Sequence, residues 1–252
     1  MLTPLLIVVG TVVVVGIGLL VVRRVIPGEA KQPHHDVAAA IFSMVGVLYA
    51  VILAFVVIVV WENHNGTGAE ANVEANEVSR LYFTARALPE PQRKEMMELA
   101  RDYAGTVAGE EWALMAQGQS SPKARAQVAR MRVVVQGMQP TTARDEILMS
   151  NSLDAINALV DARRARTGAL TSPVSPIMWI GLIAGSVITV AFTFIFDHSR
   201  YLLHLLMVGS MAALIAFTLW IVRDLSLPFA GLNAIGPDAF TQVLQRFREF
   251  PP

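Results

Sequence analysis

The sequence has no cysteine among its 252 residues, and only 16% of them are charged. The lack of cysteine excludes disulfides, thiolate metal sites and cysteine nucleophiles, but it is compatible with either redox compartment. About a quarter of the residues in a soluble domain are usually charged, so this shortage favours a protein that lies in lipid. The 20 basic and 20 acidic residues give a formal net charge of zero, so we expect no nucleic-acid partner.

Motifs for enzymatic chemistry are also missing. The sequence contains no HExxH, GxSxG, GxxxxGK(S/T) or GxGxxG pattern. It therefore lacks the residues that metalloproteases, hydrolases and nucleotide-binding proteins of these classes require. His34, His35 and Asp36 are adjacent and lack the spacing of metal ligands, and a polar helix start with Asp36 as N-cap is the better interpretation. We therefore expect no enzymatic activity, no metal and no cofactor.

Long apolar runs are what the sequence has in abundance, since 54% of its residues are hydrophobic. A helix needs about 20 residues to cross a hydrocarbon core of about 30 Å. Four runs meet this length, at residues 2–22, 37–61, 177–196 and 201–222. They predict an all-α membrane protein with two transmembrane hairpins, residues 1–61 and 177–222, because the connections within each pair are short.

The basic residues near the spans bear on orientation. Arg23 and Arg24 follow the first run, the wrong order for a cleaved signal peptide, so we expect this run to be a permanent span. With Lys31 they favour a cytoplasmic first loop, which places both termini and residues 62–176 outside the cytoplasm. Three arginines between residues 163 and 166 favour the opposite side, but the first span usually dominates.

Residues 62–176 carry helical periodicity and predict an extramembrane helical region. The second span continues into this region as a stem that Pro89 and Pro91 end, and residues 123–138 form a later helix. Thr142 and Asp145 predict a capping box that opens another helix. We expect the apolar faces of these helices to pack against one another or against further copies of the chain.

Glu110 and Glu111 come directly before Trp112. Adjacent residues point about 100° apart on a helix, so the two carboxylates do not share a site as residues four apart would. A solvated face is the expected setting for both.

Residues 223–252 form a C-terminal turn and an amphipathic helix. Proline and glycine between residues 227 and 231 interrupt the preceding helix, and Pro237 begins another. One face of this last helix is apolar and carries Phe240, Val243, Leu244, Phe247 and Phe250. This face fits an interfacial or docking helix, and it equally fits a helix that packs on the protein's own helical region.

Several separate stretches resemble one group, the bacterial bestrophin-like membrane proteins, over nearly the whole chain. The first stretch runs from His35 and Asp36 through the segment MVGVLYAVILAF at residues 44–55, which includes Gly46 and Tyr49, and ends at Trp61. The others hold Glu111 and Trp112, then Arg163, Arg164 and Arg166, and last Asp224, Pro228, Phe229 and Gly231. The resemblance implies a multi-pass protein of the bacterial inner membrane.

Bestrophins are pentameric anion channels whose pore is made from the second helix of each subunit. The resemblance therefore implies a self-associating protein in the lipid bilayer that passes small ions, with Phe42, Ser43, Tyr49 and Phe55 as candidate pore-lining residues. The sequence has no counterpart of the bestrophin neck motif or of the acidic calcium clasp. The alternative function is a non-catalytic accessory protein that presents its helical region to a partner.

Overall fold

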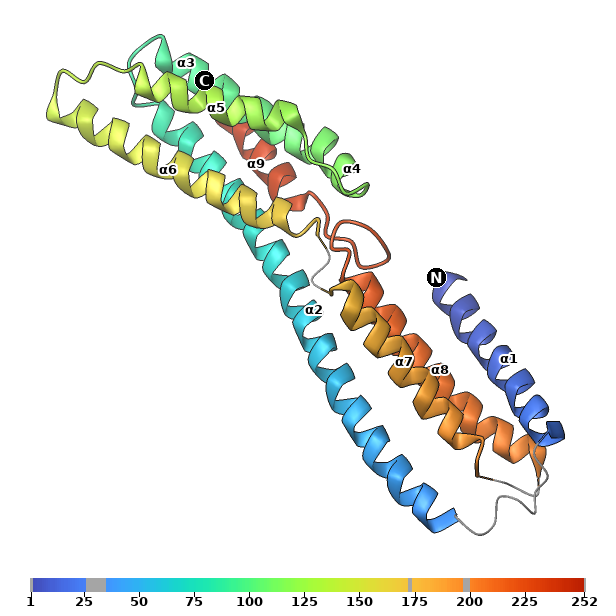
Figure 1. Ribbon diagram of the computed structural model, residues 1–252. Helices are drawn as coiled ribbons and strands as arrows, with labels where there is room; N and C mark the ends of the chain where they lie inside the picture. Colours follow the sequence, from blue (N-terminus) through green and yellow to red (C-terminus); the bar gives the residue numbers. More distant parts are fainter. Residues whose placement is uncertain (1, 26–34, 172–173, 197–199, 252) are drawn as a thin grey trace. The chain divides into compact units, whose positions relative to one another are not determined.

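The computed structural model describes residues 2–25, 35–171, 174–196 and 200–251, and all regular structure in these ranges is helical (Figure 1). The chain divides into two compact units. Unit 1 contains residues 1–62 and 173–226, and unit 2 contains residues 63–172 and 227–252. The side chains of residues 35–38, which include His35 and Asp36, lie outside the description, so the expected N-cap is not placed.

Unit 1 holds the four predicted membrane spans. They are α1 (Leu2–Val25), the first part of α2 (His35–Ala85), α7 (Pro176–Thr193) and α8 (Tyr201–Leu225). All four are long and apolar enough to cross a membrane, which confirms the prediction of four spans. Only 11–28% of the most apolar window of each helix is buried by protein, so the remaining apolar surface requires lipid or further protein to cover it.

The first span packs chiefly against the last one, a neighbour that the connection lengths do not reveal. Val15 on α1 lies in one buried cluster with Val208 and Ala212 on α8. Where the helices approach, a Cβ on Gly16 would lie 3.3 Å from the Leu205 side chain, so the small residue permits close packing. The Tyr201 hydroxyl donates a hydrogen bond to the Gly16 carbonyl at 3.4 Å.

Helix α2 is continuous over 51 residues, so the second predicted span and its predicted stem are one element. Within unit 1, Val56 and Val60 on α2 pack against Leu182 on α7 and Val222 on α8. A small apolar core shared by three helices thus lies at one end of the membrane unit, where the apolar run of α2 ends, α7 begins and α8 ends.

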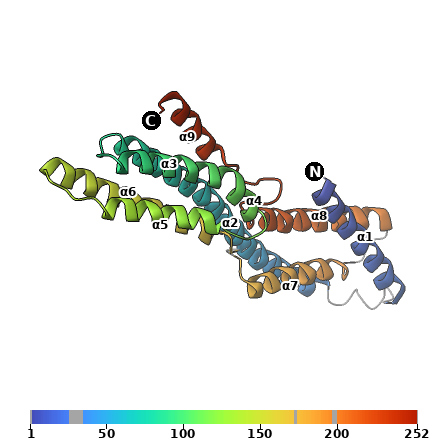
Figure 2. The same ribbon diagram turned by 90° about the horizontal axis from the view of Figure 1, so that it is seen from above.

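Unit 2 contains the rest of α2, then α3 (Gln92–Thr106), the π-helical turn η2 (Val107–Glu111), α4 (Trp112–Met115), α5 (Pro122–Gln136), α6 (Ala143–Gly168) and α9 (Asp238–Glu249). The start of α5 is fixed by the Ser121 hydroxyl, which accepts from the Ala124 amide at 3.3 Å. Thr142 and Asp145 form the predicted capping box at the start of α6. Figures 1 and 2 show α3, α5 and α6 running side by side.

The C-terminal helix α9 packs on the protein's own helical region, which decides between the two alternatives for its apolar face. Phe240, Val243 and Phe247 are buried in the core of unit 2. The Phe247 ring stacks on Tyr82 with centroids 3.9 Å apart, and the Tyr82 hydroxyl donates to the Phe250 carbonyl at 2.9 Å. This apolar face is therefore core at Phe240, Val243 and Phe247, whereas Phe250 is 49% exposed.

Candidate functional site

A cluster of buried charges lies at the centre of unit 2. It consists of Glu74 on α2, Tyr103 on α3, Glu111 at the end of η2, and Arg163 and Arg166 on α6. Four of the side chains are fully inaccessible, and Arg163 is 7% exposed. A buried charge is tolerated only when a partner of opposite sign and further hydrogen bonds compensate for its lost hydration.

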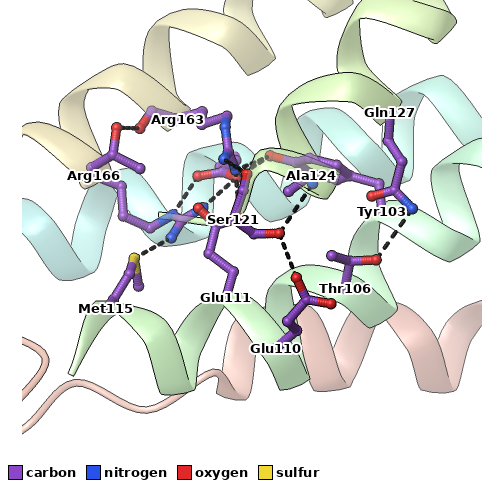
Figure 3. A network of polar contacts seen from close by, with 12 residues as sticks. Tyr103, Thr106, Glu110, Glu111, Met115, Ser121, Ala124, Gln127, Arg163 and Arg166 are labelled. Atoms are coloured by element: carbon purple, nitrogen blue, oxygen red, sulfur yellow. Dashed lines mark hydrogen bonds and ion pairs between the residues drawn. The ribbon is translucent and has the colours of Figure 1, made fainter. Parts of the chain in front are cut away.

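Arg166 has the most partners in the cluster. Its Nε donates to Glu74 Oε2 at 2.5 Å and its Nη2 donates to Glu74 Oε1 at 2.8 Å, a bidentate pair. A second carboxylate is also close, since Glu111 Oε1 lies 3.6 Å from Nη2. The third guanidinium nitrogen, Nη1, lies 2.7 Å from the sulfur of Met115 (Figure 3). The guanidinium carbon also lies 5.2 Å from the centre of the Trp112 ring, within range of a cation–π interaction.

Arg163 forms the second half of the cluster (Figure 3). Its Nη1 donates to Glu111 Oε2 at 2.7 Å and to the Tyr103 hydroxyl at 3.2 Å. Its Nη2 lies 3.4 Å from the carbonyl of Ser121, in the loop before α5. The Tyr103 hydroxyl in turn donates to Glu74, which connects the two halves. Two arginines and two glutamates leave the cluster without net charge.

The protonation states of the cluster follow from its burial. Burial, and then the negative charge of Glu74, raise the pKa of Tyr103 well above its ordinary value, so its hydroxyl stays protonated and acts as a donor. Burial acts to lower the pKa of Arg163, but Tyr103 and Glu111 outweigh it and the net shift is upward. Both arginines are charged, and the arrangement binds helices together rather than exchanging protons.

The π-helical turn η2 sets the direction of Glu111. A π turn contains one more residue than an α turn and so changes which side chains point inward. Glu111 is fully buried, whereas Glu110 is exposed and accepts a hydrogen bond from the Ser121 hydroxyl at 2.8 Å. The solvated setting expected for both is right for Glu110 and wrong for Glu111, because that expectation assumed regular α-helical periodicity and included no partner from α6.

Several residues of the family motif meet around this cluster. Trp112 follows Glu111, donates from its Nε1 to the Ile235 carbonyl at 2.8 Å, and packs edge-on against Phe229 at 5.6 Å. The Pro228 carbonyl accepts from the Ile235 amide at 2.8 Å, and Gly231 has a φ of +103°, which favours glycine. The turn after α8 therefore holds Trp112 in place.

Other motif residues lie apart from the cluster. Arg164 is largely exposed and lies 3.6 Å from Asp161, and Asp224 is buried in unit 1 near the end of α8. On α2, a Cβ at Gly46 would meet nothing within 4 Å, and Trp61 is exposed.

Glu74 and Tyr103 belong to the cluster but were not among the residues predicted from the sequence. Glu74 lies on the apolar side of the stem, three residues after Ala71 and four before Val78, both of which are buried. An acidic residue within an apolar helical stripe was the available signal for a buried charge. The role of Tyr103 as a donor depends on contacts between helices, which the sequence does not show.

The four candidate pore residues point in different directions on α2. Tyr49 is buried against α7, where its hydroxyl donates to the Leu182 carbonyl at 3.2 Å, and the Phe42 ring meets Phe196 edge-on at 5.7 Å. Ser43 and Phe55 are exposed. Phe42 and Tyr49 therefore take part in packing within the chain, whereas Ser43 and Phe55 are free to meet lipid, water or another subunit.

One face of α2 in unit 1 is exposed along its length. Met44, Leu48, Val51, Phe55 and Ile58 are each 48–70% exposed. They are separated by four, three, four and three residues, which places them in one stripe, and Glu62 follows at the next position. We call residues 44, 48, 51, 55, 58 and 62 the α2 stripe.

Among the described residues, no group of three or more histidine, aspartate or glutamate side chains is placed to hold a metal.

Replacing Arg166 by Met should destabilise unit 2 by about 3–5 kcal/mol, because Glu74 and Glu111 would lose a buried partner. The double variant E74M/R166M removes a charge of each sign and should be more stable than Arg166→Met alone. Chemical unfolding in detergent measures both. Arg164→Met, an exposed arginine on the same helix, is the control and should change stability by at most about 1 kcal/mol. Equal stability of Arg164→Met and Arg166→Met would contradict the role assigned to the cluster.

Gly185→Ala should disturb the contact between α2 and α7, because the added Cβ would lie 2.5 Å from Cδ2 of Tyr49. The tyrosine ring must move away and lose its bond to Leu182, at a cost of about 1–3 kcal/mol. Gly181→Ala is the matched control, since a Cβ there meets nothing within 4 Å. Thermal unfolding of the purified variants should show a lower midpoint for Gly185→Ala only.

Comparisons with known proteins agree with the predicted resemblance. Solved structures of two variants of a bacterial bestrophin homologue from Klebsiella pneumoniae match with TM-scores of 0.71 and 0.65 at 11% and 13% identity. The first match covers 95% of this chain and 98% of the other, and the second covers 95% and 96%. A membrane protein structure matches with a TM-score of 0.64 at 14% identity, over 98% and 97% of the two chains. At these identities the matches show the fold.

A search of curated proteins found no match to this chain. The Bestrophin-like domain family, however, matches residues 9–240, which is most of the sequence. The resemblance inferred from the motifs is thereby confirmed, and the chain belongs to the Bestrophin-like domain family.

Proposed function

We propose that this protein forms a homo-oligomeric pore that passes small ions through the bacterial inner membrane, with the α2 stripe lining the path. Membership of the Bestrophin-like family supports a channel of this kind. The observation that carries the assignment is the exposure of the stripe in a helix that buries Tyr49, Val56 and Val60, on its opposite side, against α7 and α8.

In a closed ring of identical subunits, each residue of the stripe is repeated around the axis. Phe55 and Leu48, which are 66% and 65% exposed, would then form two apolar rings two turns apart. Apolar rings at a constriction stop ion flow by losing their water. Of the four pore candidates, Phe55 is the one on the stripe, and it is the proposed gate.

The described spans support passive flow. Residues 2–22, 39–61, 177–193 and 201–222 contain no aspartate, glutamate, lysine or arginine. Proton pumps and ion-coupled transporters usually carry ionisable side chains along the path. A hydrophobic pore that needs no proton relay fits this composition better.

Glu62 bears on ion selectivity. It is the charged member of the α2 stripe, at the end of the apolar run. A ring of carboxylates at a pore mouth attracts cations and repels anions. The proposed pore therefore prefers cations, in contrast to the anion selectivity of bestrophins that the resemblance implied.

Phe55→Ala should increase ion flux severalfold, because a smaller side chain leaves the constriction wide enough to stay wet. The measurement is potassium and chloride flux from liposomes that contain the purified protein. Phe217→Ala, on an exposed phenylalanine of α8, is the control and should leave flux unchanged. The proposal fails if well-folded oligomers pass neither chloride nor cations over a range of voltage and pH.

Glu62→Gln should lower the ratio of cation to anion permeability, since it removes the charge without changing the size of the side chain. Reversal potentials in a potassium chloride gradient report this ratio. Glu249→Gln, an exposed carboxylate on α9, should leave the ratio as it is. A wild-type reversal potential at the chloride equilibrium would overturn the selectivity but not the pore.

A further inference from the structure

Unit 1 contains an apolar groove between α1, α7 and α8, with a volume of about 530 Å³. Its walls are almost entirely aliphatic and aromatic. The two hydroxyls on its walls are already used, because Thr11 donates to the Ile7 carbonyl and Ser186 donates to the Ile183 carbonyl. The walls therefore offer no free hydroxyl donor to a ligand, and they suit a chain of methylene groups.

The groove is at least as long as one leaflet of a bilayer. At the helical rise of about 1.5 Å per residue, its lining runs about 16 Å on α8, from Ala212 to Arg223, and about 22 Å on α7, from Trp179 to Phe194. Half of a hydrocarbon core of about 30 Å is about 15 Å. A single acyl chain of one leaflet would therefore extend along most of the groove.

The two ends of the groove differ in polarity. At one end lie Arg223, which is exposed, and the rings of Trp179 and Trp220. Tryptophan and arginine are the side chains that gather where a membrane meets water. The other end is apolar and is lined by Phe194 and Gly18, where a Cβ on the glycine would lie 3.3 Å from the phenylalanine ring. This polarity corresponds to an amphiphile with a negative head and an apolar tail.

The volume of the groove is that of a small-molecule site. At about 530 Å³ it lies within the range of about 300–1,000 Å³ that is usual for ligand pockets.

We propose that this groove binds one acyl chain of an anionic phospholipid, with the headgroup phosphate paired to Arg223. The aliphatic walls cover the tail, and the guanidinium supplies charge-assisted hydrogen bonds to the phosphate. Binding then stabilises the packing of α1 against α7 and α8, since the ligand contacts all three helices.

The test is native mass spectrometry of the full-length protein in detergent, titrated with dioleoyl phosphatidylglycerol or dioleoyl phosphatidylcholine. We expect tighter binding of the anionic lipid to the wild type. Arg223→Gln should weaken binding of phosphatidylglycerol about tenfold and remove the preference, as expected for the loss of one charge-assisted bond. Arg200→Gln removes the same charge at the opposite end of α8 and should bind like the wild type.

A second pair of variants tests the tail. Ala191 and Ala184 are both exposed on α7, but only Ala191 lines the groove. Ala191→Phe should fill the groove and reduce binding of both lipids, whereas Ala184→Phe should not. Equal lipid binding by these two variants would overturn the proposal. A change of subunit number in Ala191→Phe without loss of lipid would also overturn it, because the groove would then be occupied by a second copy of the chain. Ion flux is not needed for this readout, so failure of the pore proposal leaves it intact.

Discussion

The bidentate pair between Arg166 and Glu74 is the interaction on which the helical unit depends. These residues are 92 positions apart in the sequence, and their pairing joins α6 to the stem of α2. Glu111 and Arg163 extend the same cluster to the π turn, and Tyr103 joins its two halves. Because removing one member would leave an uncompensated charge in the core, the cluster accepts one arrangement of these helices and excludes others.

Stability alone does not explain a cluster of this kind, since a well-packed apolar core is often as stable as a buried ion pair. We infer that the cluster instead fixes the register between helices. The bidentate geometry fixes the rotation of α6 against α2 within unit 2. The motif residue Trp112 packs on Arg166, and Phe229 packs edge-on against Trp112.

The membrane unit depends on a different kind of contact. Its outer faces are apolar, and the contacts between its helices are few. Close approach there depends on small residues such as Gly16 and Gly185, each of which lies against a larger side chain of a neighbouring helix. The faces that remain uncovered carry the functional proposals. The α2 stripe is proposed to face copies of itself, and the groove on α1, α7 and α8 is proposed to face lipid.

The amino-acid sequence by itself determined the elements that depend on local composition. Four apolar runs became four helices, the Thr142 and Asp145 pair became a capping box, and the motifs identified the family, because each of these signals lies within a short stretch of chain. Tertiary structure decided everything that depends on a partner distant in sequence. It placed Glu111 in the interior, paired α1 with α8, turned the apolar face of α9 inward, and separated Tyr49 from Phe55 on one helix. The physical reason is that burial, charge pairing and helix packing are properties of contacts, and periodicity along one helix does not specify which other helix will provide them.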